Sequence, residues 1–280
     1  MLLSKIYKDC LRCAIWERAV RLGFALSLNG GAMDAIQKNF TLARLKTGID
    51  GLDRLLCGGI PENSQMLLLG EAGSGKTLLS FQVAYEAAKA GIHSTYLTIE
   101  EKKKSLIEFA EETFTSLSDV QKQIDSGMLR VEEKKLQYVI RSPENIQAIV
   151  AEIIRTVEEN GSRFLVIDSF SLLRSLYTDD RSFTRGVNYI IESIRNQNVT
   201  SLITFENSKQ NPNKVPGLLE ESMFDGVIKV SRKNNKGRLE YFLNVVKLRY
   251  SKFINDECRF EITPSGILVM EQSQRKISEE

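Results

Sequence analysis

The sequence predicts an α/β fold with a mostly parallel central sheet that is flanked by helices and ends in antiparallel hairpins. Three observations lead to this prediction. Continuous apolar runs such as 164–167 alternate with segments whose apolar residues recur at helical spacing. The apolar run 66–69 is joined to a helical segment by a glycine-rich turn. Beyond residue 226, turn residues separate strand-like segments at hairpin distance.

Helices are expected where apolar residues recur every three or four positions and where a glycine or proline marks an end. In chain order they are 51–56 (stopped by Gly58-Gly59), 78–90 (stopped by Gly91), 102–117, a helix opened by Ser142-Pro143 and ended by Gly161, and 183–196. Strands are expected where short apolar runs are bounded by polar or turn residues, at 65–69, 94–99, 128–132, 164–167 and 200–205. Two hairpins close the chain, with arms at 227–231 and 239–247, and at 259–262 and 267–270.

The chain divides into an extension, one domain and a tail. Residues 1–40 form an N-terminal extension that could be a basic amphipathic helix, since residues 1–32 carry five basic and two acidic side chains. Met33 offers a second start, so the extension could also be dispensable. Residues 41–272 are expected to fold as a single domain, and the polar residues 273–280 as a frayed tail.

Composition limits the classes of partner. The 280 residues include 38 basic and 36 acidic side chains, so the net charge of +2 gives no general attraction to nucleic acid or acidic lipid. No apolar stretch approaches the 18 residues of a membrane span, so no membrane association is expected. The lone C-x-x-C at Cys10 and Cys13 lacks a second ligand pair for zinc. We therefore expect ordinary reduced thiols and a cytoplasmic protein.

The glycine-rich turn has the pattern G-x-x-x-x-G-K-T between a strand and a helix. It consists of Gly70, Glu71, Ala72, Gly73, Ser74, Gly75, Lys76 and Thr77, and Leu78 follows in the helix. Glycines let backbone N–H groups close around phosphate oxygens, and the helix N-terminus adds partial positive charge. Lys76 is predicted to reach the β- and γ-phosphates of a nucleoside triphosphate, and the Thr77 hydroxyl to hold Mg²⁺.

Carboxylates at other strand ends complete the predicted site. Asp168 ends the apolar run 164–167 and is predicted to hold Mg²⁺ through its hydration shell, although a strand-end aspartate can also simply cap a loop. Glu100 and Glu101 follow the strand at 94–99, where a carboxylate can orient or deprotonate the attacking water. The alternative is a solvated pair at the start of the next helix, where acidic side chains are favourable.

The ordered motifs resemble the KaiC-type branch of the RecA-like ATPases over residues 42–270. They are T-G-I-D-G-L-D at 47–53, G-G-I-P at 58–61, the phosphate loop at 70–77, Glu100-Glu101, Asp168-Ser169 and Lys247-Leu248-Arg249. The resemblance implies a RecA-like fold and hexamers with ATP between neighbouring subunits. It implies that Glu100 and Glu101 are paired catalytic glutamates.

The resemblance also implies that Lys247, Leu248 and Arg249 contact the neighbouring subunit's nucleotide. Positive charge supplied in this way would stabilise the transferring phosphoryl group. Without the resemblance, Lys247 and Arg249 would be interpreted as the exposed side chains of an edge strand whose residues alternate between its two faces. The next residues depart from the family pattern, because bulky Tyr250 replaces the usual glycine and Phe253 the usual histidine, whereas Ser251 still offers a hydroxyl to the nucleotide.

Three functions fit these motifs. The first is a Mg²⁺-dependent ATPase that acts in signalling or regulation, with self-phosphorylation and a protein signalling partner as further options. The second is a DNA-recombination or repair ATPase of the RecA and RadA kind, which needs basic loops facing DNA. The candidate loops 170–182 and 207–220 are not strongly basic, so DNA is the less favoured partner. The third is a nucleotide-gated scaffold that binds ATP with little turnover.

Overall fold

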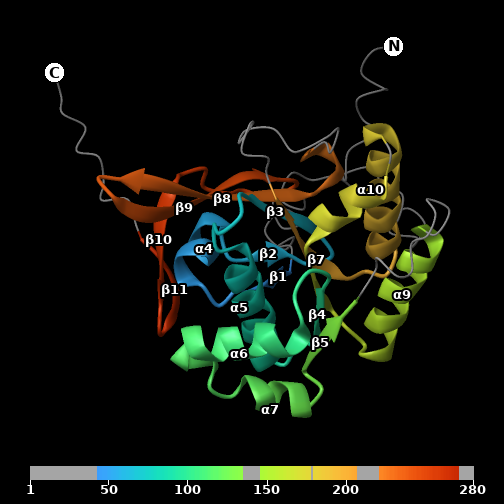
Figure 1. The fold of residues 1–280 in the computed structure, drawn as a ribbon, viewed down its shortest axis with the longest axis horizontal. Coiled ribbons are helices and arrows are strands. Elements are labelled where there is room, and N and C mark those ends of the chain that lie inside the picture. The colour runs from blue at the N-terminus through green and yellow to red at the C-terminus, as the bar shows by residue number, and fades with distance from the viewer. Residues whose placement is uncertain (1–42, 135–145, 178, 207–220, 271–280) are drawn as a thin grey trace, which may run out of the picture. The chain divides into compact units, whose positions relative to one another are not determined.

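The computed structural model describes residues 43–134, 146–177, 179–206 and 221–270. The predicted extension at 1–40, the tail at 273–280 and the loop 207–220 lie outside these ranges. The main sheet consists of β3 (Gln65–Gly70), β4 (Ser94–Thr98), β5 (Leu129–Glu133), β6 (Phe164–Asp168), β7 (Thr200–Glu206), β8 (Gly226–Asn235), β9 (Arg238–Leu248), β10 (Cys258–Thr263) and β11 (Gly266–Val269). Their order across the sheet is β11-β10-β9-β8-β3-β7-β6-β4-β5 (Figure 1).

The predicted fold class is confirmed. Strands β8, β3, β7, β6, β4 and β5 run parallel, and β9, β10 and β11 continue the sheet in antiparallel register. Parallel strands need crossover connections, which the helices between β3, β4, β5, β6 and β7 provide. The last four strands follow one another directly, as the turn residues predicted.

Helices cover both faces of the sheet (Figure 1). They are α4 (Asp50–Leu55), α5 (Lys76–Lys89), α6 (Lys103–Thr113), α7 (Val120–Asp125), α9 (Ile146–Glu159) and α10 (Asp180–Arg195), with short 3₁₀ turns η1 (Thr115–Leu117), η3 (Phe170–Leu176) and η4 (Glu221–Met223). Strand β3 shows the division, since Met66 and Leu68 join the core around α5, whereas Leu67 and Leu69 join the core around α9 and α10. Both faces of β3 are therefore buried, as expected of a central parallel strand.

The T-G-I-D-G-L-D segment acts as a structural clamp. The carboxylate of Asp53, which is buried, accepts hydrogen bonds from the Thr47 backbone N–H at 2.8 Å and from the Thr47 hydroxyl at 2.9 Å. Gly48 has φ +72°, and a Cβ at this position would lie 2.4 Å from Cγ of Glu86 on α5. The segment lies between β1 (Arg44–Leu45) and β2 (Ile60–Pro61), which form a two-stranded sheet. The motif therefore packs closely against α5 at Gly48.

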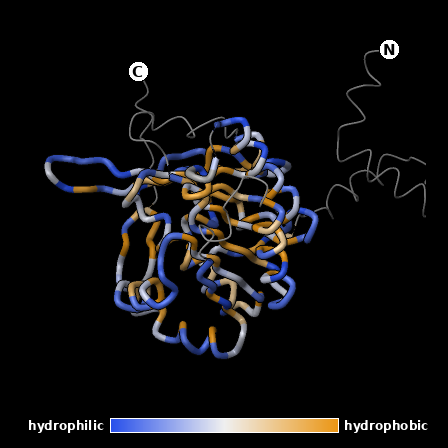
Figure 2. Tube along the Cα trace, turned by 45° about the vertical axis from the view of Figure 1, so that its right-hand side comes forward, coloured by the Kyte–Doolittle hydropathy of each residue, from blue (hydrophilic) through white to orange (hydrophobic). Residues whose placement is uncertain are grey.

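Several boundaries differ from the prediction, and two of the differences have a clear physical reason. The helix expected at 102–117 ends at Thr113, because Phe114 adopts an extended conformation and buries its ring completely; η1 and the unpredicted α7 follow. The first hairpin turn, expected over 233–237, contracts to Lys236 and Gly237, which both have positive φ. Two residues with positive φ are typical of tight hairpins whose strands twist together. The protruding tip of this long hairpin is largely hydrophilic (Figure 2).

The start of the helix predicted from Ser142-Pro143 falls within 135–145, outside the described residues, and α9 is described from Ile146. Across the described ranges, no helix combines the length and the apolar character that a membrane crossing requires.

Candidate active site at the carboxyl ends of the parallel strands

The sheet register brings the predicted site residues to one edge. Gly70 at the end of β3 pairs with Glu206 at the end of β7, and Thr98 at the end of β4 pairs with Asp168 at the end of β6. The glycine-rich loop and Glu100 follow directly from these strand ends. In open parallel sheets, ligands bind outside the carboxyl ends of the strands.

The loop between β3 and α5 has the conformation of an anion cradle. Gly73 and Gly75 have φ of +72° and +91°, and Gly75 caps the N-terminus of α5. A Cβ on Gly70 would lie 2.5 Å from the backbone oxygen of Val230, so this position has room only for glycine. The first backbone N–H groups of α5 have no partner within the helix and attract anions. The buried Ser74 hydroxyl also has no hydrogen-bond partner among the described residues. The loop therefore offers free donors for phosphate.

Lys76 lies folded against this loop. Its side chain is 9% exposed, and its Nζ donates to the backbone oxygens of Gly70 and Glu71, both at 2.9 Å. Burial lowers the pKa of Lys76, and nearby carboxylates, led by Glu206 and Asp168, partly offset this effect. Glu206 was not predicted as a site residue, although its position directly after the apolar strand 200–205 could have indicated it. The Lys76 ammonium group therefore lies near several carboxylates, whose negative charge would also attract a divalent cation.

Asp168 is held by two hydroxyl groups. Its Oδ2 accepts from the Tyr96 hydroxyl at 2.7 Å, and its Oδ1 accepts from the Thr204 hydroxyl. In the described part of the chain, no three histidine, cysteine or acidic side chains converge as a ready-made metal site. Mg²⁺ is usually held by one or two carboxylates together with water and substrate phosphates. Asp168 and the half-buried Thr77 fit that pattern.

Glu100 and Glu101 differ in their surroundings. The Ser169 hydroxyl donates to Oε1 of Glu100 at 2.8 Å, which ties this carboxylate to the residue after Asp168. The Thr98 hydroxyl turns the backbone at Glu101, since it accepts from the Glu101 N–H at 3.1 Å and donates to the Glu101 oxygen at 2.9 Å. Partial desolvation, followed by the charges of Asp168 and Glu100, raises the pKa of Glu101. The pair thus lies beside the predicted metal ligand.

Lys247 and Arg249 are not brought to this edge. Lys247 pairs with Val227, three residues before the Val230 that pairs with Gly70, so it lies about 10 Å further back along the strands. Its Nζ donates to the backbone oxygens of Glu221 and Phe224 at 2.6 and 2.7 Å. Burial and the charge of Arg249 lower the pKa of Lys247. Both cations belong to the opposite, amino-terminal edge of β8.

Leu248 and Ser251 also lie away from the loop. Leu248 is buried in the core, so only its backbone is available to a ligand. The Ser251 hydroxyl accepts a hydrogen bond from Arg44, whose guanidinium also donates to the oxygens of Leu56 and Gly59, both at 2.8 Å. Tyr250 beside it has φ +57° and is 69% exposed.

In the described part of the first candidate DNA-binding loop, the positive charge of Arg174 is already paired. The guanidinium pairs with Asp180 at 2.7 Å, donates to the Tyr177 oxygen at 2.9 Å and lies over the Phe183 ring. The second loop, 207–220, is outside the described residues.

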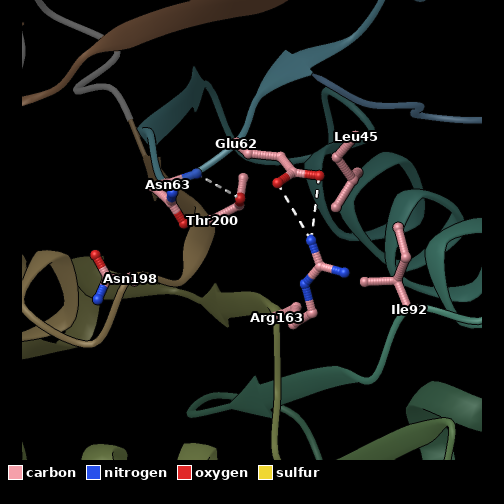
Figure 3. A pocket seen from close by; sticks show the side chains of 7 residues that line it. All are labelled: Leu45, Glu62, Asn63, Ile92, Arg163, Asn198 and Thr200. Carbon is pink, nitrogen blue, oxygen red and sulfur yellow. Dashed lines mark hydrogen bonds and ion pairs between the residues drawn. The ribbon is translucent and has the colours of Figure 1, made fainter. Parts of the chain in front are cut away.

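The amino ends of the strands carry a small hollow lined by Leu45, Glu62, Asn63, Ile92, Arg163, Asn198 and Thr200 (Figure 3). The Arg163 guanidinium points toward the Glu62 carboxylate (Figure 3) and pairs with it at 3.2 Å. Both charges are thereby neutralised, and none of the predicted site residues lies here. The phosphate loop, Glu100 and Asp168 lie instead at the carboxyl edge of the sheet.

Comparison with known proteins decides the family. Residues 45–274 match the family described as "ATPase: KaiC". The chain belongs to the KaiC family of ATPases. A UPF0273 protein of Thermotoga maritima is 28% identical over 237 residues, which cover 81% of this chain and 96% of that protein. The crystal structure of the KaiC-like protein PH0186 from Pyrococcus horikoshii has a TM-score of 0.71 and 26% identity, and covers 82% of this chain and all of that one.

Relatives with a named biological role are longer. The circadian clock protein KaiC2 of Synechocystis is 25% identical over 236 residues, which cover 83% of this chain but 41% of that protein. The chain thus corresponds in length to the UPF0273 proteins and to less than half of KaiC2. Membership in the KaiC family identifies it as a nucleotide-binding ATPase domain with a RecA-like fold.

Proposed function

We propose that this chain binds ATP with Mg²⁺ and hydrolyses it at sites formed between neighbouring copies of itself. The observation that carries the proposal is the convergence of the phosphate loop, Asp168 and the pair Glu100 and Glu101 at one edge of the sheet. Lys76 and the free N–H groups of α5 would bind the phosphates. Thr77 and Asp168 would hold Mg²⁺, which neutralises charge on the β- and γ-phosphates when bound.

The two glutamates would supply the base. A carboxylate is a stronger base when its pKa is raised towards neutrality, as is that of Glu101. Glu100, whose carboxylate is oriented by Ser169, would fix the direction of the attacking water. Together they would direct hydrolysis of the γ-phosphate without a histidine.

A second copy would complete the site. Lys247 and Arg249 lie at the edge of β8 remote from their own phosphate loop, where they would reach the loop of a neighbour that packs head to tail. Head-to-tail contacts of this kind close into rings when the rotation permits. We propose a ring, hexameric as in the family resemblance, with ATP at each interface. Leu248 and Ser251 would border the same contact.

The first experiment separates binding from hydrolysis. Lys76→Ala should abolish ATP binding, whereas Glu100→Gln/Glu101→Gln should bind ATP and lose steady-state hydrolysis. ATP binding by Lys76→Ala equal to that of the unmodified chain would refute the proposal. Tight binding with negligible turnover in the unmodified chain would instead favour the nucleotide-gated scaffold.

The second experiment tests the shared site by mixing two inactive variants. One partner carries Glu100→Gln/Glu101→Gln and the other Lys247→Ala/Arg249→Ala. In a random mixed ring, about a quarter of the interfaces would combine intact glutamates with intact cations, so hydrolysis should recover to about that level. Equal mixtures that stay inactive, although light scattering shows mixed rings, would contradict the role of Lys247 and Arg249.

The regulatory role and its partner can be tested alongside. We propose that nucleotide turnover controls a protein signalling partner, and the relation to KaiC2 is its support. Transfer of label from γ-labelled ATP to the chain would reveal self-phosphorylation. Hydrolysis stimulated by single-stranded DNA, with binding that weakens in salt, would favour the recombination alternative.

A further inference from the structure

Behind the proposed metal site, a line of buried hydroxyl groups joins β4, β6, β7 and α5. Tyr96 on β4 is completely buried, and its hydroxyl donates to Asp168 at 2.7 Å. The Ser80 hydroxyl on α5 lies 3.1 Å from the Tyr96 hydroxyl and 3.1 Å from the backbone oxygen of Thr77. Thr204 on β7 binds the other oxygen of Asp168.

The number of hydrogens on each group determines which group donates in each of these hydrogen bonds. The Asp168 carboxylate can only accept, so Tyr96 gives its single hydroxyl hydrogen to it. The Tyr96 oxygen is then free to accept from Ser80. Ser80 also has one hydrogen, which the Tyr96 oxygen and the Thr77 carbonyl share. The chain of contacts therefore ends at the backbone of Thr77 on one side and at the Asp168 carboxylate on the other.

We infer that Tyr96 is a positioning residue for the metal side of the site, because it fixes Asp168 relative to the helix that carries Thr77. The inference rests on the proposed Mg²⁺-dependent binding of ATP. Asp168 and Thr77 come from different elements, β6 and α5, and the Tyr96 hydroxyl links them through Ser80. With both of its oxygens already bound to hydroxyl groups, Asp168 cannot rotate freely, and its remaining lone pairs would be available to accept from water molecules of a bound Mg²⁺.

The ring of Tyr96 is itself held in place. It lies edge-on to the ring of Phe81 on α5, with centroids 5.4 Å apart. Removing only the hydroxyl therefore leaves the packing of the ring intact, so Tyr96→Phe tests the hydrogen bond and not the core. Tyr85 on α5 provides a matched control, since its hydroxyl also donates to an aspartate, Asp119, which directly precedes α7.

The test compares AMP-PNP binding by calorimetry in Mg²⁺ and in EDTA. The unmodified chain should gain affinity in Mg²⁺, and Tyr96→Phe should lose about tenfold of that gain, equal to about 1.4 kcal/mol. Affinity in EDTA should stay unchanged, because phosphate contacts are retained. Tyr85→Phe should keep the full gain. Ser80→Ala, which cuts the link from the helix side, should reduce it as Tyr96→Phe does.

Each outcome separates the two proposals. If the unmodified chain gains no affinity in Mg²⁺, the proposed function and this inference both fail. If it does and Tyr96→Phe retains the full gain, only the inference fails. Equal losses in Mg²⁺ and in EDTA would show a merely structural role and would also overturn it. Rescue of a Thr204→Val defect by Thr204→Ser would support the same arrangement from β7.

Discussion

Asp225 offers a measurable link between the fold and the proposed interface. This residue immediately precedes β8, and its side chain is 16% exposed. One carboxylate oxygen accepts from the buried Gln65 N–H at 2.9 Å and lies 3.2 Å from the Arg195 guanidinium. The other oxygen faces Arg249 at 3.6 Å. Asp225 therefore joins the start of β3, the end of α10 and one of the proposed interface cations.

Replacing Asp225 with alanine should destabilise the fold by about 1.5–5 kcal/mol. Leaving the Gln65 N–H buried without an acceptor costs about 1–3 kcal/mol. Each partly exposed ion pair adds about 0.2–1 kcal/mol. Asp225→Asn keeps an oxygen for Gln65 and loses only the charge, so about 1 kcal/mol is expected.

Urea unfolding without nucleotide measures both changes as differences in midpoint at constant slope. Equal destabilisation by Asp225→Asn and Asp225→Ala would refute the hydrogen-bond argument. A loss below about 0.5 kcal/mol for Asp225→Ala would refute the whole assignment, since that is the size of an ordinary surface substitution.

Three further predictions concern catalysis and stability. Because the charge of Glu100 helps to raise the pKa of Glu101, Glu100→Gln should move the acid limb of residual kcat/KM to lower pH. Gly48→Ala should cost about 2–4 kcal/mol in urea unfolding, since it combines a left-handed φ with a clash against Glu86. Hydrogen bonds to Arg155 and Lys134 lower the pKa of Glu152 to about 2, so its stabilisation is complete above pH 4.5 and is lost towards pH 2. Glu152→Gln should flatten that part of the stability curve.

The sequence was most informative where backbone geometry restricts the residue type. The phosphate loop needs glycine at fixed positions, and Gly70 and Gly75 occupy the tight and left-handed positions that this pattern implies. Strand ends marked by a change from apolar to acidic residues likewise predicted Asp168 and Glu100. These signals are local, so a single sequence contains them.

Residues that only strand pairing brings to the site were harder to predict. Tyr96 lies in a buried strand and reads as an ordinary core residue until the pairing of β4 with β6 places it beside Asp168. Glu206 gains its meaning only when β7 pairs with β3. The separation of Lys247 from the phosphate loop depends on β8 lying between β9 and β3. Each of these facts is long-range, and local periodicity does not specify it.

Strand β8 has a consequence for communication around the proposed ring. At its amino end, Asp225 holds Arg249, which we assign to a neighbour's site. At its carboxyl half, Arg232 pairs with Glu71 in the chain's own phosphate loop. About 23 Å of strand separates these contacts, and β8 pairs with β9 along this length and with β3 over residues 226–230. In the proposed ring, β8 would thus directly connect the phosphate loop of one site to a cation offered to the next site.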